Sequence, residues 1–196
     1  MENALEFIKS RRSTRKFSSQ PVEQEKLEAV VEAGRYAPTG GNSQATHFIV
    51  IRNREVLGHL ADLVKETFAG MTAEPGTYRS IAASIRASKA GHYVFHYDPP
   101  VLILTANQRD YGNNMADCAC ALENMMLEAN ALDLGSCWIN QLRWLNEDPR
   151  ILAYLHTLGL EENERVYGAL SLGYPDSGLP NRTPTERHGN PVTVVE

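Results

Sequence analysis

One stretch of the chain, residues 113–132, has almost no hydrophilic face, and it limits the possible folds more than any other feature. Its length and composition predict a helix. Small or apolar side chains fill most of its positions: Met115, Ala116, Cys118, Ala119, Cys120, Ala121, Leu122, Met125, Met126 and Leu127. A helix that is apolar nearly all round is a buried helix. We therefore expect it inside the domain or at a contact between two subunits.

Short apolar strands and amphipathic helices alternate along the rest of the chain. Helices are expected over residues 4–10, 22–36, 54–68 and 148–158. Strands are expected over residues 46–53, 99–107 and 166–173, and residues 134–140 turn into a further element. This alternation favours an α+β fold in three layers, with helices on both faces of a sheet.

Two segments depart from the alternation. Residues 70–98 contain glycines, a proline and four aromatic residues between Tyr78 and Tyr97, so we expect an excursion that forms a partly helical lid. Residues 174–196 are rich in proline, glycine and polar residues, and wrapping a second subunit would order them. No repeat and no clear boundary divides the chain, so we expect one domain over residues 1–196.

Composition and charge argue against several classes of protein. The chain has 196 residues and a net charge of −5, which disfavours a nucleic-acid-binding protein. No apolar run approaches the roughly 18 residues that span a bilayer. The N-terminal charges follow the apolar residues, which is the wrong order for a signal peptide. Three cysteines without disulfide spacing favour a reducing cytoplasm.

The sequence RRSTR, residues 11–15, concentrates cations in this acidic chain. Alternate side chains of an extended segment point the same way, so Arg11, Ser13 and Arg15 would converge while Arg12 points elsewhere. The planar fork of arginine donors matches phosphate oxygens, and a serine hydroxyl adds a neutral donor. The pattern indicates a phosphate site, with a solvated basic turn and a kinase phosphorylation site as the alternatives.

The sequence PTGGNSQ, residues 38–44, follows the helix expected over residues 22–36. Two glycines allow a ligand close to the backbone, and the side-chain amides of Asn42 and Gln44 suit the edge of a heterocyclic ring. A plain helix-terminating loop is the alternative. The Gly-x-Gly-x-x-Gly fingerprint and the Walker loop are both absent from the sequence. A nicotinamide cofactor would therefore bind without a Rossmann unit.

Other catalytic and metal motifs receive little support. His92 and His96 stand four residues apart, but the glutamate of a zinc protease is missing between them. Cys118 and Cys120 would point apart on a helix. No Gly-x-Ser-x-Gly elbow is present. Cys137, beside Trp138, is expected as a packed thiol more than as a nucleophile.

The order of these segments resembles the nitroreductase family of FMN enzymes, in its short bacterial members. The segments that carry the resemblance are RRSTRKF, APTGGNSQATHFIVI, PPVLIL, ALENMMLEANALDLGSCWIN and LSLGYP, in this order. The resemblance is weakest over residues 70–98. It implies a mixed sheet flanked by helices, in an intertwined homodimer whose C-terminal arm, residues 174–196, crosses onto the partner. It also implies two FMN sites at the subunit interface, each drawing on both chains.

The resemblance also implies which residues bind FMN. The phosphate and ribityl clamp of the family corresponds to Arg11, Arg12 (through its backbone), Ser13 and Arg15. The loop contributed by the other subunit corresponds to Pro38, Thr39, Gly40, Asn42 and Gln44. The segment over the flavin ring corresponds to Cys137, Trp138, Ile139 and Asn140. The basic residue of the tail that meets the phosphate corresponds to Arg187, with Arg182 as the alternative.

The implied activity is the reduction of electron-poor small molecules, such as nitroaromatics or quinones, with NADH or NADPH as the electron donor. Donor and acceptor would take turns at one open flavin face, which predicts ping-pong kinetics. No side chain is expected as a catalytic acid or base, and no metal is expected. Other flavin chemistry, namely reductive dehalogenation, dehydrogenation of a ring or flavin breakdown, and a non-catalytic flavin-binding redox role stay open. For a zwitterionic substrate, the excursion offers Arg79, Arg86 and Lys89 without an evident acidic partner.

Overall fold

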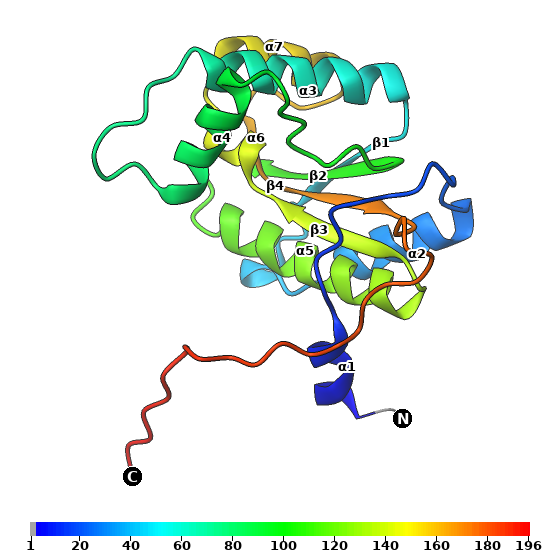
Figure 1. Ribbon diagram of the computed structural model, residues 1–196. Helices are drawn as coiled ribbons and strands as arrows, with labels where there is room; N and C mark the ends of the chain where they lie inside the picture. The colour runs from blue at the N-terminus through cyan, green and yellow to red at the C-terminus, as the bar shows by residue number, and fades with distance from the viewer. Residues whose placement is uncertain (1–2) are drawn as a thin grey trace.

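A four-stranded sheet lies between two layers of helices in the computed structural model, which describes residues 3–196 (Figure 1). The strands are β1 (His47–Ile51), β2 (Val101–Gln108), β3 (Gly135–Ile139) and β4 (Glu164–Gly173). Their order in the sheet is β1-β2-β4-β3, and all neighbours are antiparallel. Parallel pairing enters through one isolated bridge, between Ser13 and Ser136. β1, β2 and β4 fall where the sequence predicts strands, whereas β3 lies in residues 134–140, which the sequence marked only as a turn into a further element.

Helices cover both faces of the sheet, as the sequence predicts. Figure 1 places α3 (Arg54–Ala69) and α7 (Pro149–Thr157) on one face, and α2 (Gln24–Arg35) and α5 (Asn114–Ala131) on the other. The remaining helices are α1 (Ala4–Ser10), α4 (Arg79–Lys89), the short α6 (Gln141–Trp144) and the single turn η1 (Gly40–Asn42). No helix within residues 3–196 has the length and apolar character that crossing a membrane requires.

The central strand β2 shows why both faces need a helix layer. Leu102 and Leu104 pack into the core under α3 and α7, whereas Val101 and Ile103 pack into the second core under α2 and α5. Side chains alternate across a strand, so a strand that is apolar at successive positions must be buried on both faces. The continuous apolar run of this strand therefore encodes a three-layer fold.

Helix α5 is buried on one face and open on the other. Leu122 and Met125 are fully buried against the sheet and α2. Ala116 and Cys120 on the outer face are exposed, and Leu127 is half-buried. The domain thus covers only part of this helix and leaves a stripe at the surface in which one glutamate lies among small and apolar residues.

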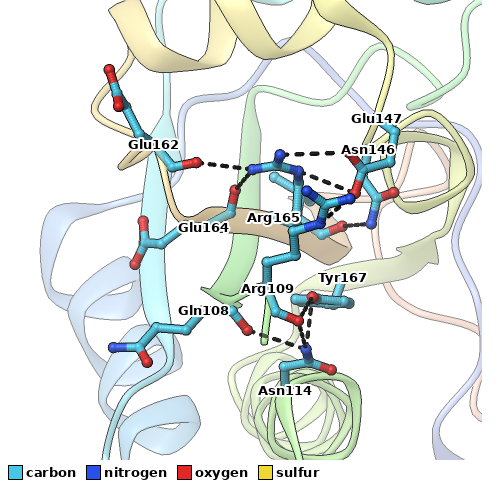
Figure 2. A network of polar contacts seen from close by, with 10 residues as sticks. Gln108, Arg109, Asn114, Asn146, Glu147, Glu162, Glu164, Arg165 and Tyr167 are labelled. Carbon is cyan, nitrogen blue, oxygen red and sulfur yellow. Dashed lines mark hydrogen bonds and ion pairs between the residues drawn. The ribbon is translucent and has the colours of Figure 1, made fainter. Parts of the chain in front are cut away.

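A polar network fixes the end of the sheet at which α5 begins (Figure 2). The buried Arg165 of β4 pairs with Glu147 at 3.4 Å, and Arg109 pairs with the same carboxylate at 3.1 Å. The Asn114 amide donates to the Arg109 carbonyl at 2.8 Å and to the Tyr167 hydroxyl at 2.7 Å. The network ties the first residue of α5 to the ends of β2 and β4.

The two ends of the chain project from this body. No residue of α1 is buried, although Leu5 and Ile8 are large and apolar. In Figure 1 the arm, residues 174–196, passes close to α1 and then runs away from the sheet. Val192, Val194 and Val195 near its end are exposed. Within the described residues, the arm forms no helix or strand beyond an isolated bridge between Phe17 and Pro175.

Candidate functional site

Residues 11–15, hereafter the clamp segment, lie along the outer edge of β3. The Thr14 amide donates to the Ser136 carbonyl at 2.8 Å. Gly135 makes this close approach possible, because a Cβ at that position would lie only 2.6 Å from Thr14 Oγ1. The clamp segment can therefore lie against β3 only because position 135 is a glycine.

The side chains of the clamp segment alternate. Arg11, Ser13 and Arg15 all lie near enough to the Cys137 thiol of β3 to act on its pKa. Burial raises the pKa of Cys137, and Arg15, the Ser13 hydroxyl and Arg11 each act in the opposite direction. Arg12 points the other way and donates to the Thr183 carbonyl of the arm at 2.6 Å. Two guanidinium groups and one hydroxyl thus gather on one side of the segment.

Arg11 has a donor without a partner. Its Nη1 is buried and makes no hydrogen bond within residues 3–196. A buried cationic donor that stays unpaired is costly, so such a group is expected to have an anionic partner in the working protein. The donor set around it, two arginines and a serine, suits phosphate oxygens.

Residues 38–44, hereafter the glycine loop, adopt a left-handed backbone at three positions. The φ values are 59° at Gly41, 56° at Asn42 and 50° at Gln44. Glycine and asparagine tolerate this conformation, but glutamine rarely adopts it. Side chains held in such strained conformations concentrate at ligand-binding sites.

The glycine loop is anchored to the beginning of α5. The buried Asp117 carboxylate accepts from the Gly40 amide at 3.1 Å and from the Ser43 hydroxyl at 3.4 Å. The Tyr111 hydroxyl donates to the Gly40 carbonyl at 3.0 Å. A Cβ at position 40 would overlap Tyr111 and Asn113, so this position requires glycine while the anchor is in place.

The two groups of residues that the sequence singles out line two different cavities, each of about 470 Å³. The first lies between the end of α2 and β1, and the glycine loop contributes Thr39, Asn42 and Gln44. The second lies between α4 and the end of β3, which contributes Trp138, Ile139 and Asn140. Pro38 and Gly40 are placed with the glycine loop, and Cys137 with the clamp segment.

The glycine loop and the clamp segment lie at opposite edges of the protein. The glycine loop leads into β1 and the clamp segment borders β3, and three strand spacings of about 4.8 Å separate these edges by about 14 Å. The loop is tied to α5 at Asp117, whereas Ser10 beside the clamp segment accepts from Asn130. At 1.5 Å per residue, these anchors lie about 20 Å apart along the helix. Within one chain, the two groups therefore lie well apart.

A chain of hydrogen bonds, which the sequence did not indicate, lies along the second cavity. The Trp138 indole donates to Asn140 Oδ1 at 3.0 Å, and the backbone N–H of Asn140 donates to Gln141 Oε1 at 3.2 Å. Gln141 Nε2 donates to the Tyr93 hydroxyl at 2.7 Å, which also pairs with Ser84. The residues over the cavity are thereby tied to α4, inside the excursion.

Of the three cations that the excursion offers, one lies at the second cavity. Arg79, at the first position of α4, lines the second cavity. Arg86 and Lys89 lie in the last turn, are exposed and are not part of its lining. In addition, the Arg15 guanidinium lies 5.9 Å from the centre of the Tyr97 ring, which joins the clamp segment to the same cavity.

The two tail arginines differ in their contacts. Arg182 donates to Asp133 at 2.7 Å and to the Asn130 carbonyl at the end of α5, so its charge is paired within its own chain. Arg187 is exposed on the arm. Only Arg187 thus keeps a charge that a distant ligand could use.

The histidines and cysteines form no metal cluster within residues 3–196. His96 is buried, contacts the Leu57 carbonyl through Nε2 and accepts from the Asp98 amide at Nδ1. Burial lowers the pKa of His96 and raises that of Cys118 to about 12. These groups are neutral parts of the core, and neither is placed for catalysis.

The chain is similar to known proteins over most of its length. The family model of the nitroreductase family matches residues 8–174. A candidate NADH dehydrogenase/NAD(P)H nitroreductase of Archaeoglobus fulgidus is 33% identical over 175 residues, which cover 89% of this chain and 87% of that protein.

Two crystal structures of nitroreductases with bound FMN resemble the whole chain. The structure from Bacteroides fragilis is 35% identical with a TM-score of 0.87, and both chains are covered completely. The structure from Desulfitobacterium hafniense is 25% identical with a TM-score of 0.80, again over both whole chains. The chain therefore belongs to the nitroreductase family and is an oxidoreductase of that family.

Proposed function

We propose that this protein is an FMN-dependent NAD(P)H oxidoreductase that reduces electron-poor small molecules such as nitroaromatics or quinones. The observation that carries the proposal is the convergence of Arg11, Ser13 and Arg15, with the buried Arg11 Nη1 unpaired. FMN bound to the structures from B. fragilis and D. hafniense supports the same cofactor here.

The residues of the clamp segment fit the phosphate of FMN. They offer two guanidinium groups and a hydroxyl, and the unpaired Arg11 donor gains an acceptor when a phosphate binds. Arg187, free on the arm, is proposed as a further cation for the phosphate. Arg12 contributes through its backbone, because its side chain is directed to the arm.

The chain's own groups would hold the cofactor and leave one face open. Backbone donors near Trp138, Ile139 and Asn140, with the amides of Asn42 and Gln44, are proposed to hydrogen-bond the ring and to stabilise its reduced, anionic form. FMN held by these residues would supply the hydride and electron transfer between the nicotinamide and the acceptor. The chain has no Rossmann fingerprint to bind the dinucleotide separately, so we propose that donor and acceptor use one place in turn.

We propose that the complete site needs a second copy of the chain. The glycine loop and the clamp segment lie at opposite edges of one protomer, and a two-fold partner can bring the loop of one chain to the clamp of the other. The uncovered stripe of α5, with Ala116, Cys120 and Leu127, suits a subunit contact. A partner that contacts this stripe would bury the face of α5 that one chain leaves open, as the largely apolar composition of the helix predicts.

The arm fits the same assembly. Its valines at positions 192, 194 and 195 are exposed on a single chain, and β1 is an edge strand with Val50 partly exposed. Contact of the arm with the partner would cover apolar groups of this kind. We propose a cytoplasmic protein, in keeping with three cysteines that are all free.

The test is the visible spectrum of the purified protein with NADH or NADPH added in the absence of oxygen. A yellow protein that either donor bleaches, and that an added quinone or nitroaromatic restores, supports the proposal. In double-reciprocal plots of rate against donor concentration, parallel lines at different acceptor concentrations would support binding of donor and acceptor in turn at one place. A protein that neither binds added FMN nor bleaches contradicts it.

A further inference from the structure

We propose that the cavity between α4 and β3 selects acceptors that are flat, aromatic and negatively charged, with Arg79 binding the negative group. This inference rests on the proposed function, because it assigns the acceptor class of the same enzyme. The cavity, of about 470 Å³, falls in the usual size range of small-molecule pockets.

The walls of the cavity are aromatic. Its lining contains Tyr78, Tyr93, Tyr97, Trp138 and Trp144. Tyr78 and Trp144 contact edge to face with ring centres 5.9 Å apart. Flat rings gain most from such surroundings, through burial of their faces and through edge-to-face contacts. An aromatic molecule is therefore a better occupant than an aliphatic one.

The polar groups of the inner wall are already paired. The Tyr93 hydroxyl contacts Ser84 and Gln141, both at 2.7 Å, and the Trp138 indole donates to Asn140. Hydrogen bonds that are satisfied inside the protein offer little to a ligand, and a polar substituent placed beside them would lose its water without compensation. The inner part of the cavity thus favours the plain face of a ring.

The lining of the cavity also contains a positive charge, at the beginning of α4. Among the lining residues within 3–196, Arg79 is the one that is charged, and no aspartate or glutamate joins it. Its side chain is exposed and forms no ion pair with the described part of the chain. Arg79 and Ser80 begin α4, where no acidic residue occupies the first turn and no side chain caps the helix. The charge of Arg79 is consequently available to an anion at the mouth.

The combination distinguishes between acceptors of the same shape. A ring can lie among the aromatic walls while a carboxylate on its edge meets the Arg79 guanidinium. A neutral amide of the same size gains the aromatic contacts but not the charged one. Arg79 should therefore be the residue that makes the enzyme prefer a negatively charged acceptor over a neutral one of the same shape.

The experiment compares 4-nitrobenzoate with 4-nitrobenzamide in steady-state assays of the FMN-loaded enzyme with NADH. The wild type should prefer the benzoate in kcat/KM by about tenfold, as expected for one charge-assisted hydrogen bond. Arg79→Gln should abolish most of this preference. Arg86→Gln, which removes the same charge from the far end of α4, should keep it.

A binding measurement makes the inference independent of turnover. Both tryptophans of the chain, Trp138 and Trp144, line the cavity, so their fluorescence reports its occupancy. Benzoate should change the fluorescence of the FMN-loaded protein at lower concentrations than benzamide, and Arg79→Gln should remove the difference. Equal binding of the two probes by the wild type would overturn the inference, whether or not the protein reduces any acceptor.

Three further outcomes would overturn it in different ways. If Arg79→Gln leaves the benzoate preference intact, the selectivity lies elsewhere. If the variant raises the KM for NADH instead, the anion that Arg79 binds is a phosphate of the dinucleotide. If the variant loses FMN, Arg79 belongs to the cofactor site. Absence of bleaching by NADH or NADPH contradicts the proposed function instead, and the benzoate titration still decides the inference.

Discussion

The clamp segment and the glycine loop differ in how their polar groups are used. The segment that carries Arg11, Ser13 and Arg15 is held through its backbone on β3, and the buried Arg11 Nη1 remains unpaired. In the glycine loop, the backbone itself is held by polar side chains, Asp117 and Tyr111. The clamp segment is thus prepared for an anion, whereas the glycine loop is prepared to hold one strained shape.

Two buried thiols illustrate the same contrast. Burial raises the pKa of both Cys137 and Cys118, but the charged neighbours of Cys137 are positive and those of Cys118 are negative. Arg15 and Arg11 act to lower the pKa of Cys137, whereas Asp117 and Glu164 add to the rise at Cys118. The positive charges therefore gather beside the clamp segment, whereas the anchor of the glycine loop carries negative charge.

The largest effect is expected from Arg11→Gln. Loss of a charged hydrogen bond to phosphate costs about 2–3 kcal/mol, or about 30- to 150-fold in FMN affinity. The dissociation constant from quenching of flavin fluorescence checks this. Lys16→Gln, an exposed position just beyond the clamp segment, should bind FMN like the wild type. Equal affinity of both variants would remove the phosphate assignment.

Gly135→Ala should weaken FMN binding next most, by about tenfold, because it forces the clamp segment away from β3. The added Cβ meets Thr14, and overpacking of this kind also costs about 1–3 kcal/mol of stability. Gly58→Ala in α3 is the matched control, since its Cβ meets no atom within 4 Å. The control should gain about 1 kcal/mol in stability and leave FMN affinity unchanged.

Asp117→Ala should loosen the glycine loop and leave the clamp segment intact. We expect faster hydrogen exchange at the Gly40 amide, unchanged exchange in β3, and an FMN affinity lower by a few-fold. The loop loses one charged acceptor, worth about 1.5–3 kcal/mol at most. Faster exchange in both regions would indicate general destabilisation and would contradict separate anchoring of the two halves.

The smallest effect concerns pH. The pKa of Cys118 rises from 9.0 to about 12 on folding, so above pH 9 the unfolded thiol loses its proton while the folded one keeps it. The contribution of this neutral thiol to the free energy of unfolding is fully present below pH 9 and is lost as the pH rises toward 12. The loss is about 1 kcal/mol between pH 9 and pH 10. Urea denaturation of wild type and Cys118→Ala checks this. The wild type should lose stability more steeply, and parallel curves would contradict the assignment.

Much of the fold could be predicted from local pattern. The continuous apolar run of β2 and the alternation of strands and helices require two helix layers, and the structure has them. The alternation of Arg11 to Arg15 could also be predicted, since it follows from extended backbone alone. The nearly apolar composition of α5 indicated burial without saying which of its faces the domain would cover.

Contacts between distant segments could not be predicted in this way. Nothing near position 40 indicates that Asp117 would hold the glycine loop, and nothing near position 93 indicates a contact with Gln141. The sequence does not distinguish Arg79 from Arg86 and Lys89, and only the place of α4, which begins at Arg79, decides which of them lines the cavity. The cluster of aromatic residues between 78 and 97 was the available signal for that cavity.

The central claim is that the two halves of each site come from different chains, and a mixed dimer tests it most directly. One protomer carries Arg11→Gln and Arg15→Gln, the other carries Asn42→Ala and Gln44→Ala, and separate affinity tags isolate the mixed dimer. Shared sites predict one intact and one doubly altered site, hence one FMN per dimer bound with wild-type affinity, while each parent homodimer binds weakly. A mixed dimer that binds no better than its parents would contradict the account, because each chain would then build its site alone.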